Sequence, residues 1–149
     1  MYYVRKLKQF LSSQYAFMAK CHFFHWNVEG TDFKQLHDFF QELYEDMFNN
    51  PIDQTAEHIR MLDGYAPGSL ERFLELSRID GQIEIPRSRI MLEKTRDDLD
   101  ILIELAKEIV SFAPEQENSD PSSGFVSGRI DVMMKYRWMI QSMLKENRT

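Results

Sequence analysis

The sequence predicts an all-α protein: a four-helix bundle with a short extra helix in the long crossover between the second and third long helices. Apolar residues recur at three- and four-residue spacing through four long segments, and the alternating pattern of β-strands is absent. Five prolines and six glycines leave room for long helices. The 149 residues suit a single domain, 1–149, with a sizeable core.

The first predicted helix covers residues 2–28. Gly30 follows it and can adopt the left-handed conformation that often ends a helix. The apolar residues of this segment keep the spacing of an amphipathic helix, and we expect them to form part of the core. They are Tyr3, Leu7, Phe10, Leu11, Phe17, Met18, Cys21 and Phe24.

The second predicted helix covers residues 33–62. Its apolar stripe steps by five residues between Met47 and Ile52, and Pro51 lies within that step. Because proline removes a helical hydrogen bond and clashes with the preceding turn, we expect a kink, a π-type bulge or a brief restart at Asn49–Pro51. One inserted residue would explain both the proline and the shifted stripe.

The remaining helices are predicted over 70–76, 87–112 and from about 120 to Glu146. The long connection that contains the short helix is typical of a ferritin-like bundle rather than a simple up-and-down bundle. The core side of the last helix is predicted to carry Phe125, Val126, Ile130, Met133, Arg137, Ile140 and Leu144.

The net charge, the single cysteine and the absence of a long apolar run limit the classes of protein to which this chain can belong. The net charge of −6 argues against a DNA-binding surface over the whole protein and suits a protein that attracts cations. Cys21 is the lone cysteine, which excludes an internal disulfide and fits a reducing cytoplasm. No apolar run is long enough to span a membrane, and the N-terminus lacks the pattern of a signal peptide. We therefore expect a cytoplasmic protein.

Two histidines and two carboxylates form the candidate site: His25, His37, Asp53 and Glu57. Imidazole nitrogen with carboxylate oxygen suits iron, zinc or manganese. His37 and Asp53 are sixteen residues apart on one predicted helix, which is roughly 24 Å at 1.5 Å per residue. One copy of the chain therefore cannot bring both to one ion, whereas two antiparallel copies across a twofold axis can. The pattern predicts a metal site shared between subunits.

Each of these residues also has a simpler interpretation. Asp53 and Glu57 could form part of a solvated helix face, and the histidines could be structural. His22 is expected to be a packed or interface histidine rather than an accessory ligand, and His58 is expected at the surface. No Glu-x-x-His occurs, which argues against a di-iron site within one bundle. The His-Glu-x-x-His, P-loop and Rossmann motifs are also missing.

A resemblance to a known family rests on several fixed spacings. The sequence runs His25-Trp26-Asn27-Val28-x-Gly30-x-x-Phe33-x-x-Leu36-His37, then Leu43-Tyr44, then Asp53-x-x-Ala56-Glu57-x-Ile59-Arg60, and ends with the aromatic-rich segment Lys135–Ile140. In these features it resembles the Dps branch of the ferritin superfamily, the mini-ferritins or DNA-binding proteins from starved cells, over nearly the whole chain. The resemblance implies a dodecameric hollow shell that oxidises Fe(II), usually with hydrogen peroxide, stores the ferric mineral and protects against oxidative stress.

The same resemblance implies the roles of individual residues. His25 and His37 of one subunit, with an Asp53–Glu57 pair from its partner, would bind the iron and form the catalytic ferroxidase site. Trp26, first of all a core or interface aromatic, could intercept radicals near the iron. The acidic residues of the turn before the last helix would line a threefold ion-entry pore, with a solvated turn as the alternative. They are Glu115, Glu117 and Asp120.

The sequence departs from the family pattern in three places. Gln41, next to Glu42, stands where the family has a carboxylate four residues after the second histidine, so a second metal ion should bind weakly. One extra residue precedes Asp53, and only a local bulge would restore the family register. Almost nothing precedes the first helix, where many members carry a basic DNA-binding tail.

The leading prediction is a cytoplasmic ferroxidase that binds iron, uses peroxide or oxygen and forms a homo-oligomer, with DNA binding weak or absent. One alternative is a nucleoid-binding protein without catalysis. The other is a ferritin-like cage whose ferroxidase site is degenerate.

Overall fold

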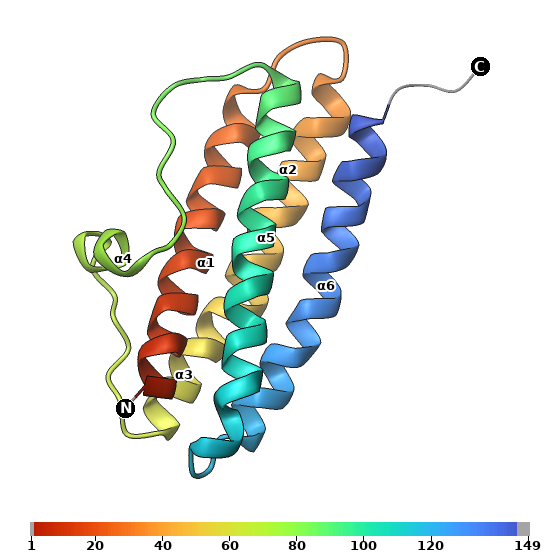
Figure 1. Cartoon of the computed structure of the whole chain (residues 1–149). Helices are drawn as coiled ribbons and strands as arrows, with labels where there is room; N and C mark the ends of the chain where they lie inside the picture. Colours follow the sequence, from red (N-terminus) through yellow and green to blue (C-terminus); the bar gives the residue numbers. More distant parts are fainter. Residues whose placement is uncertain (1, 146–149) are drawn as a thin grey trace.

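Four long helical rods pack side by side in the computed structural model, which describes residues 2–145 (Figure 1). No strand occurs within this range. The predicted all-α bundle, with one short helix in the crossover, is confirmed. The elements in order are α1 (Tyr2–Asn27), α2 (Phe33–Met47), the π-helical η1 (Phe48–Ile52), α3 (Asp53–Met61), α4 (Leu70–Leu76), α5 (Ser88–Phe112), the short 3₁₀ turn η2 (Ala113–Glu115) and α6 (Asp120–Leu144).

One long crossover sets the topology of the bundle. The rod formed by α2, η1 and α3 runs antiparallel to α1, and the chain then returns along the outside of α1 to begin α5 at the opposite end (Figure 1). As a result α5 runs in the same direction as the second rod, and α6 runs back beside it. Within the crossover Ser69 caps α4, because its hydroxyl accepts a hydrogen bond from the backbone N–H of Arg72 at 3.1 Å.

The predicted apolar stripes meet in a single core. Leu7, Phe10, Phe17 and Phe24 of α1 are fully buried and pack with the stripes of the other rods. Cys21 belongs to this core, and burial raises the pKa of its thiol well above the ordinary value. The thiol is therefore held in its unreactive neutral form.

The irregularity expected at Asn49–Pro51 is a π turn, η1. In a π turn each backbone carbonyl accepts a hydrogen bond from the N–H five residues later in the chain. The carbonyl four residues before a proline, which a regular α-helix would leave unpaired, therefore has a donor in the residue after the proline. The Thr55 hydroxyl donates a 2.6 Å hydrogen bond to the carbonyl oxygen of Pro51. Of the three irregularities expected here, a kink, a π-type bulge or a brief restart, the π-type bulge is the one observed.

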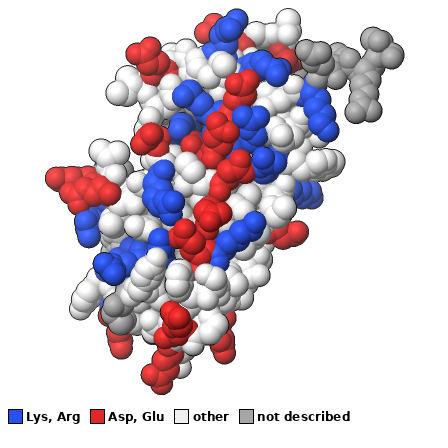
Figure 2. Space-filling model, in the orientation of Figure 1, with Lys and Arg blue, Asp and Glu red and all other residues white. Residues whose placement is uncertain are grey.

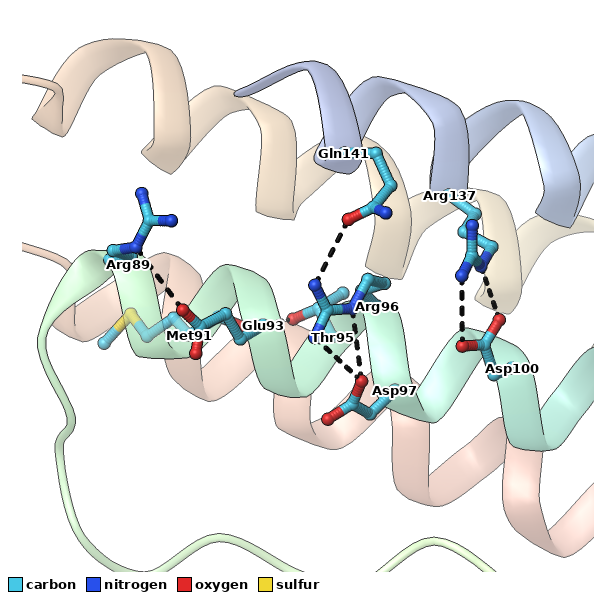
Figure 3. Close-up of polar contacts among 9 residues, drawn as sticks. All are labelled: Arg89, Met91, Glu93, Thr95, Arg96, Asp97, Asp100, Arg137 and Gln141. Atoms are coloured by element: carbon cyan, nitrogen blue, oxygen red, sulfur yellow. Dashed lines mark hydrogen bonds and ion pairs between the residues drawn. The ribbon is translucent and has the colours of Figure 1, made fainter. Parts of the chain in front are cut away.

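The predicted core side of the last helix is wrong at Arg137. This residue is partly exposed and forms an ion pair with Asp100 of α5, with Nε 2.5 Å from Oδ1 (Figure 3). The buried arginine of α6 is Arg129, which is 7% exposed. Arg129 can be buried because its charge is matched by Asp46 of α2. The predicted helix end at Glu146 lies outside the described residues.

The prediction that His58 lies at the surface is also wrong, because this residue is only 8% exposed. Its ring lies 5.5 Å from that of Phe125, near the start of α6. The end of α3 is thus covered by a helix that begins almost sixty residues later in the chain. No helix within residues 2–145 is both long and apolar enough to cross a membrane.

Candidate metal centre

His25 and His37 lie face to face where α1 and α2 meet. His25 is in the last turn of α1, His37 begins the second turn of α2, and Gly30 turns the chain between them with a φ of +115°. The ring centroids are 3.9 Å apart and the rings are inclined by 17°. The fold therefore brings both predicted imidazole ligands together within one chain.

Each imidazole is held by the backbone of the other residue. Nδ1 of His25 lies 2.7 Å from the carbonyl oxygen of His37, and Nδ1 of His37 lies 2.7 Å from the carbonyl oxygen of His25. A carbonyl oxygen only accepts, so each Nδ1 carries the proton that is donated. In a neutral ring this leaves the Nε2 lone pair free, and a bond of this kind fixes ring orientation in metal-binding histidines.

Aromatic rings surround this pair. Phe33 stacks on His37 with centroids 4.9 Å apart, and Tyr44 lies edge-on to His25 at 5.3 Å. His22 packs between Tyr44, at 4.3 Å, and the exposed Trp26, at 3.9 Å. Burial and the neighbouring His25 lower the pKa of His22. His22 is a packed histidine, as the sequence predicts.

Asp53 and Glu57 lie on α3 with exposed side chains. Within residues 2–145 no three His, Cys, Asp or Glu side chains gather into a group that could hold a metal ion. The two carboxylates thus do not join the imidazoles of their own chain. Their role as ligands to a partner's metal stays a prediction.

Gln41 and Glu42 lie one turn beyond His37 on α2. The Gln41 amide nitrogen donates to Glu45 Oε1 at 2.8 Å, so Gln41 has a partner within its own helix, and Glu42 is exposed. An amide oxygen is a neutral and therefore weaker ligand for Fe(II) than a carboxylate. The chain contributes no carboxylate at the position of Gln41.

The three acidic residues predicted to line a pore all have exposed side chains at the turn between α5 and α6. A pore requires several copies of the chain, so this role stays a prediction. The residues are Glu115, Glu117 and Asp120.

The ion pair between Asp46 and Arg129 is not among the features that the sequence predicts. Arg129 donates to both carboxylate oxygens of Asp46, at 3.2 and 2.5 Å, and the Asn50 amide donates to the same carboxylate at 2.8 Å. The sequence feature that points to a buried arginine is the position of Arg129, which lies four residues before Met133 within the apolar stripe of the last helix. Two residues so far apart in the sequence cannot be paired from spacing alone.

Comparisons with known proteins identify the family. A ferritin-like domain model matches residues 4–149. The crystal structure of Dps from Staphylococcus aureus superposes with a TM-score of 0.92 at 27% identity, covering 97% of this chain and 96% of that one. The chain belongs to the Dps family of ferritin-like proteins.

Two further Dps proteins support this assignment. Dps from Vibrio cholerae, described as a member of a broad superfamily of ferritin-like diiron-carboxylate proteins, matches with a TM-score of 0.90 at 26% identity, covering 96% of this chain and 89% of that one. The DNA protection during starvation protein of Helicobacter pylori is 27% identical over 139 residues, which is 93% of this chain and 95% of that protein. The Dps likeness therefore extends over nearly the whole chain.

Proposed function

We propose that this chain is a mini-ferritin subunit that binds Fe(II) between two copies of itself, oxidises it with hydrogen peroxide or oxygen and stores the ferric product inside an oligomeric shell. Membership of the Dps family supports iron storage and protection as the general function. The observation that carries the specific proposal is the reciprocal pairing of His25 and His37, which leaves two Nε2 atoms free on adjacent rings.

The remaining ligands would come from a second copy. His37 and Asp53 lie toward opposite ends of the rod formed by α2, η1 and α3, so an antiparallel neighbour would place its Asp53 and Glu57 beside these imidazoles. The outer face of α4 supports such an assembly, because Leu70 and Leu74 are 74% and 71% exposed. Tyr15 and Phe23 of α1 line the apolar groove beside them. Apolar surface of this kind favours burial against another protein.

The proposed chemistry treats iron as the substrate. Two Fe(II) ions each give one electron to hydrogen peroxide, the O–O bond breaks, and two hydroxide ions form with no free hydroxyl radical. The imidazoles and carboxylates hold the ions, and the carboxylates offset part of their charge. With Gln41 in place of a carboxylate, we expect one ion to bind more weakly than the other.

An anaerobic Fe(II) titration of the assembled protein tests the site. His37→Ala should abolish tight binding, whereas the control His22→Phe should retain it, because phenylalanine keeps the ring between Trp26 and Tyr44. Size-exclusion chromatography checks that each variant still assembles. Equal binding by wild type and His37→Ala would contradict the assignment.

A mixing experiment tests whether the site is shared. One chain carries His25→Ala and His37→Ala, and the other carries Asp53→Asn and Glu57→Gln, so neither parent should bind iron. Co-assembly of the two chains should create dimers with one complete site and restore part of the binding. Failure of the co-assembled protein to bind iron, with both parents correctly assembled, would rule out the shared site.

The alternatives predict other results. A nucleoid-binding protein would shift DNA in a gel at physiological salt. The face seen in Figure 2 carries a line of acidic side chains with Lys and Arg on either side, which offers phosphate no uninterrupted basic surface. A degenerate cage would assemble normally but oxidise iron no faster than buffer. The dodecameric state and the cytoplasmic location stay predictions.

A further inference from the structure

The helical rod that carries His37, Asp53 and Glu57 contains one residue more than a regular helix can hold in register. Asp53 follows His37 by sixteen residues. At about 100° per residue, a continuous α-helix would place Asp53 about 160° around the axis from His37, on the opposite side. With one residue absorbed by the π turn, the separations from His37 fall to about 60° for Asp53 and about 100° for Glu57.

The buried residues on either side of η1 show that the extra residue is absorbed. Met47 before the turn and Ile59 after it are 1% and 0% exposed. A continuous helix would rotate these two side chains about 120° apart, whereas absorbing one residue brings them within about 20° of each other. The π turn therefore keeps the core stripe continuous and turns the Asp53–Glu57 face toward the His37 side.

Contacts on both sides of the rod hold this turn. On one side Asp46, just before η1, accepts hydrogen bonds from Arg129 of α6 and from Asn50 within the turn. The Arg129 and Asp46 side chains are 8% and 13% exposed. On the other side the Thr55 hydroxyl, which bonds to the Pro51 carbonyl, lies 3.4 Å from Oε1 of the buried Gln14.

The ion pair between Asp46 and Arg129 differs from the other ion pair that α6 forms within residues 2–145. The pair between Arg137 and Asp100 is half exposed, with side chains 37% and 47% accessible, and it bridges two regular helices. Arg129 instead donates to the carboxylate of Asp46, which also accepts a hydrogen bond from Asn50 in the π turn. A buried charge needs such a partner, so loss of Arg129 would leave Asp46 free to reorient and release Asn50.

We propose that Arg129, acting through Asp46 and Asn50, is a positioning residue that holds the π turn in the register required by Asp53 and Glu57. This role rests on the proposed function, since it concerns the metal site shared between subunits. Arg129 touches neither the metal nor the oxidant. It determines which side of the rod the carboxylates occupy.

Co(II) binding by the assembled protein, followed by visible absorption, tests this role. Arg129→Met should weaken binding at least tenfold, while the matched control Arg137→Met should stay within twofold of wild type. Deletion of Asn49, an exposed residue of the turn, removes the extra residue and should preserve binding. In that shortened chain Arg129→Met should no longer weaken binding, because no π turn remains to be held. A purely structural role would reduce binding in both backgrounds.

Three results would overturn the proposal: normal binding by Arg129→Met, an equal loss in Arg137→Met, or an undiminished loss in the shortened chain. If the shortened chain does not assemble, amide hydrogen exchange over residues 48–52 decides instead. Faster exchange in Arg129→Met than in Arg137→Met supports the proposal, and equal rates contradict it. Failure of wild type to bind Co(II) more tightly than His37→Ala would instead remove the proposed function, and this role with it.

Discussion

Lys20 of α1 and Asp98 of α5 form an ion pair inside the bundle, with Nζ 2.9 Å from Oδ2 and side chains only 7% and 9% exposed. The same ammonium group donates to the carbonyl oxygen of Asp80 in the crossover at 3.1 Å. Burial raises the pKa of Asp98, and the hydrogen bond from Lys20 opposes that rise. One lysine thus connects two long helices and the segment that crosses between them.

Removal of one member of this pair should destabilise the protein strongly. Lys20→Met leaves an unpaired buried carboxylate, so we expect a loss of about 3–5 kcal/mol in the free energy of unfolding. The double variant Lys20→Met/Asp98→Leu should recover much of that loss, because no charge remains buried. Urea unfolding measures both. A double variant as unstable as the single one would show that packing, not the unpaired charge, is responsible.

The pair between Lys6 and Glu108 predicts a pH dependence. Lys6 Nζ lies 2.7 Å from Glu108 Oε2. The hydrogen bond from Lys6 lowers the pKa of Glu108 below the ordinary value of 4.5, and burial of the carboxyl group opposes this effect in part. A lowered carboxyl pKa means that the stabilisation is fully present above 4.5 and is lost as pH falls through the folded-state value.

Glu108→Gln should therefore destabilise the protein at pH 7, by at most about 1 kcal/mol because the pair is partly exposed. The difference from wild type should shrink as the pH falls below the ordinary value of 4.5. Glu104→Gln, an exposed glutamate one turn earlier on α5, is the matched control and should show little change at either pH. A destabilisation by Glu108→Gln that grows as the pH falls would contradict a lowered pKa of Glu108.

Gly64 packs closely against α1. A Cβ at this position would lie 2.8 Å from Val4 Cγ1 and 3.1 Å from Ile59 Cγ2. Gly64→Ala should cost about 1–3 kcal/mol through overpacking. Gly68→Ala is the control, because nothing lies within 4 Å of its added Cβ. Thermal unfolding of the two variants should differ in midpoint, and equal midpoints would show that Val4 moves aside without cost.

The reciprocal bonds of His25 and His37 predict a tautomer that can be measured. Both neutral rings should carry their proton on Nδ1 in the metal-free protein, since Nδ1 donates to a carbonyl oxygen in each case. Nitrogen NMR of histidine-labelled protein distinguishes the two ring nitrogens. A protonated Nε2 on either neutral ring would mean that its free lone pair points away from the proposed metal position.

Gln41→Asp should strengthen the second metal position. The change adds a negative charge one turn from His37 and removes the amide hydrogen bond to Glu45. We expect a larger number of tightly bound Fe(II) ions per site and faster oxidation, measured by anaerobic titration and stopped-flow absorbance. Gln35→Asp, on an exposed turn of the same helix, controls for charge alone. An unchanged stoichiometry would place the second ion away from Gln41.

Much of the fold could be predicted because it depends on local spacing. Apolar periodicity placed the long helices within one or two residues of their observed ends wherever those ends are described, and the five-residue step beside Pro51 located the π turn. The pairing of His25 with His37 in one subunit was implied by the family resemblance, and the short turn that connects the end of α1 to the start of α2 brings the two residues together. Backbone geometry within a few residues determines each of these features.

The pairing of charges could not be predicted in the same way. Arg129 and Arg137 are alike in the sequence, yet one is buried against Asp46 and the other is half exposed beside Asp100. His58 is covered by Phe125 of a distant helix. These outcomes depend on how far each helix is rotated against its neighbours, which the tertiary packing decides.

The sequence alone thus determined the helices and the place of the irregular turn, because hydrogen bonding and side-chain spacing act over a few residues. The meeting of the two imidazoles followed from the family resemblance. Only the tertiary structure decided which Nε2 atoms are free and which arginine supports the turn. Both depend on groups from different helices meeting at hydrogen-bonding distance, where a rotation of one residue would separate them.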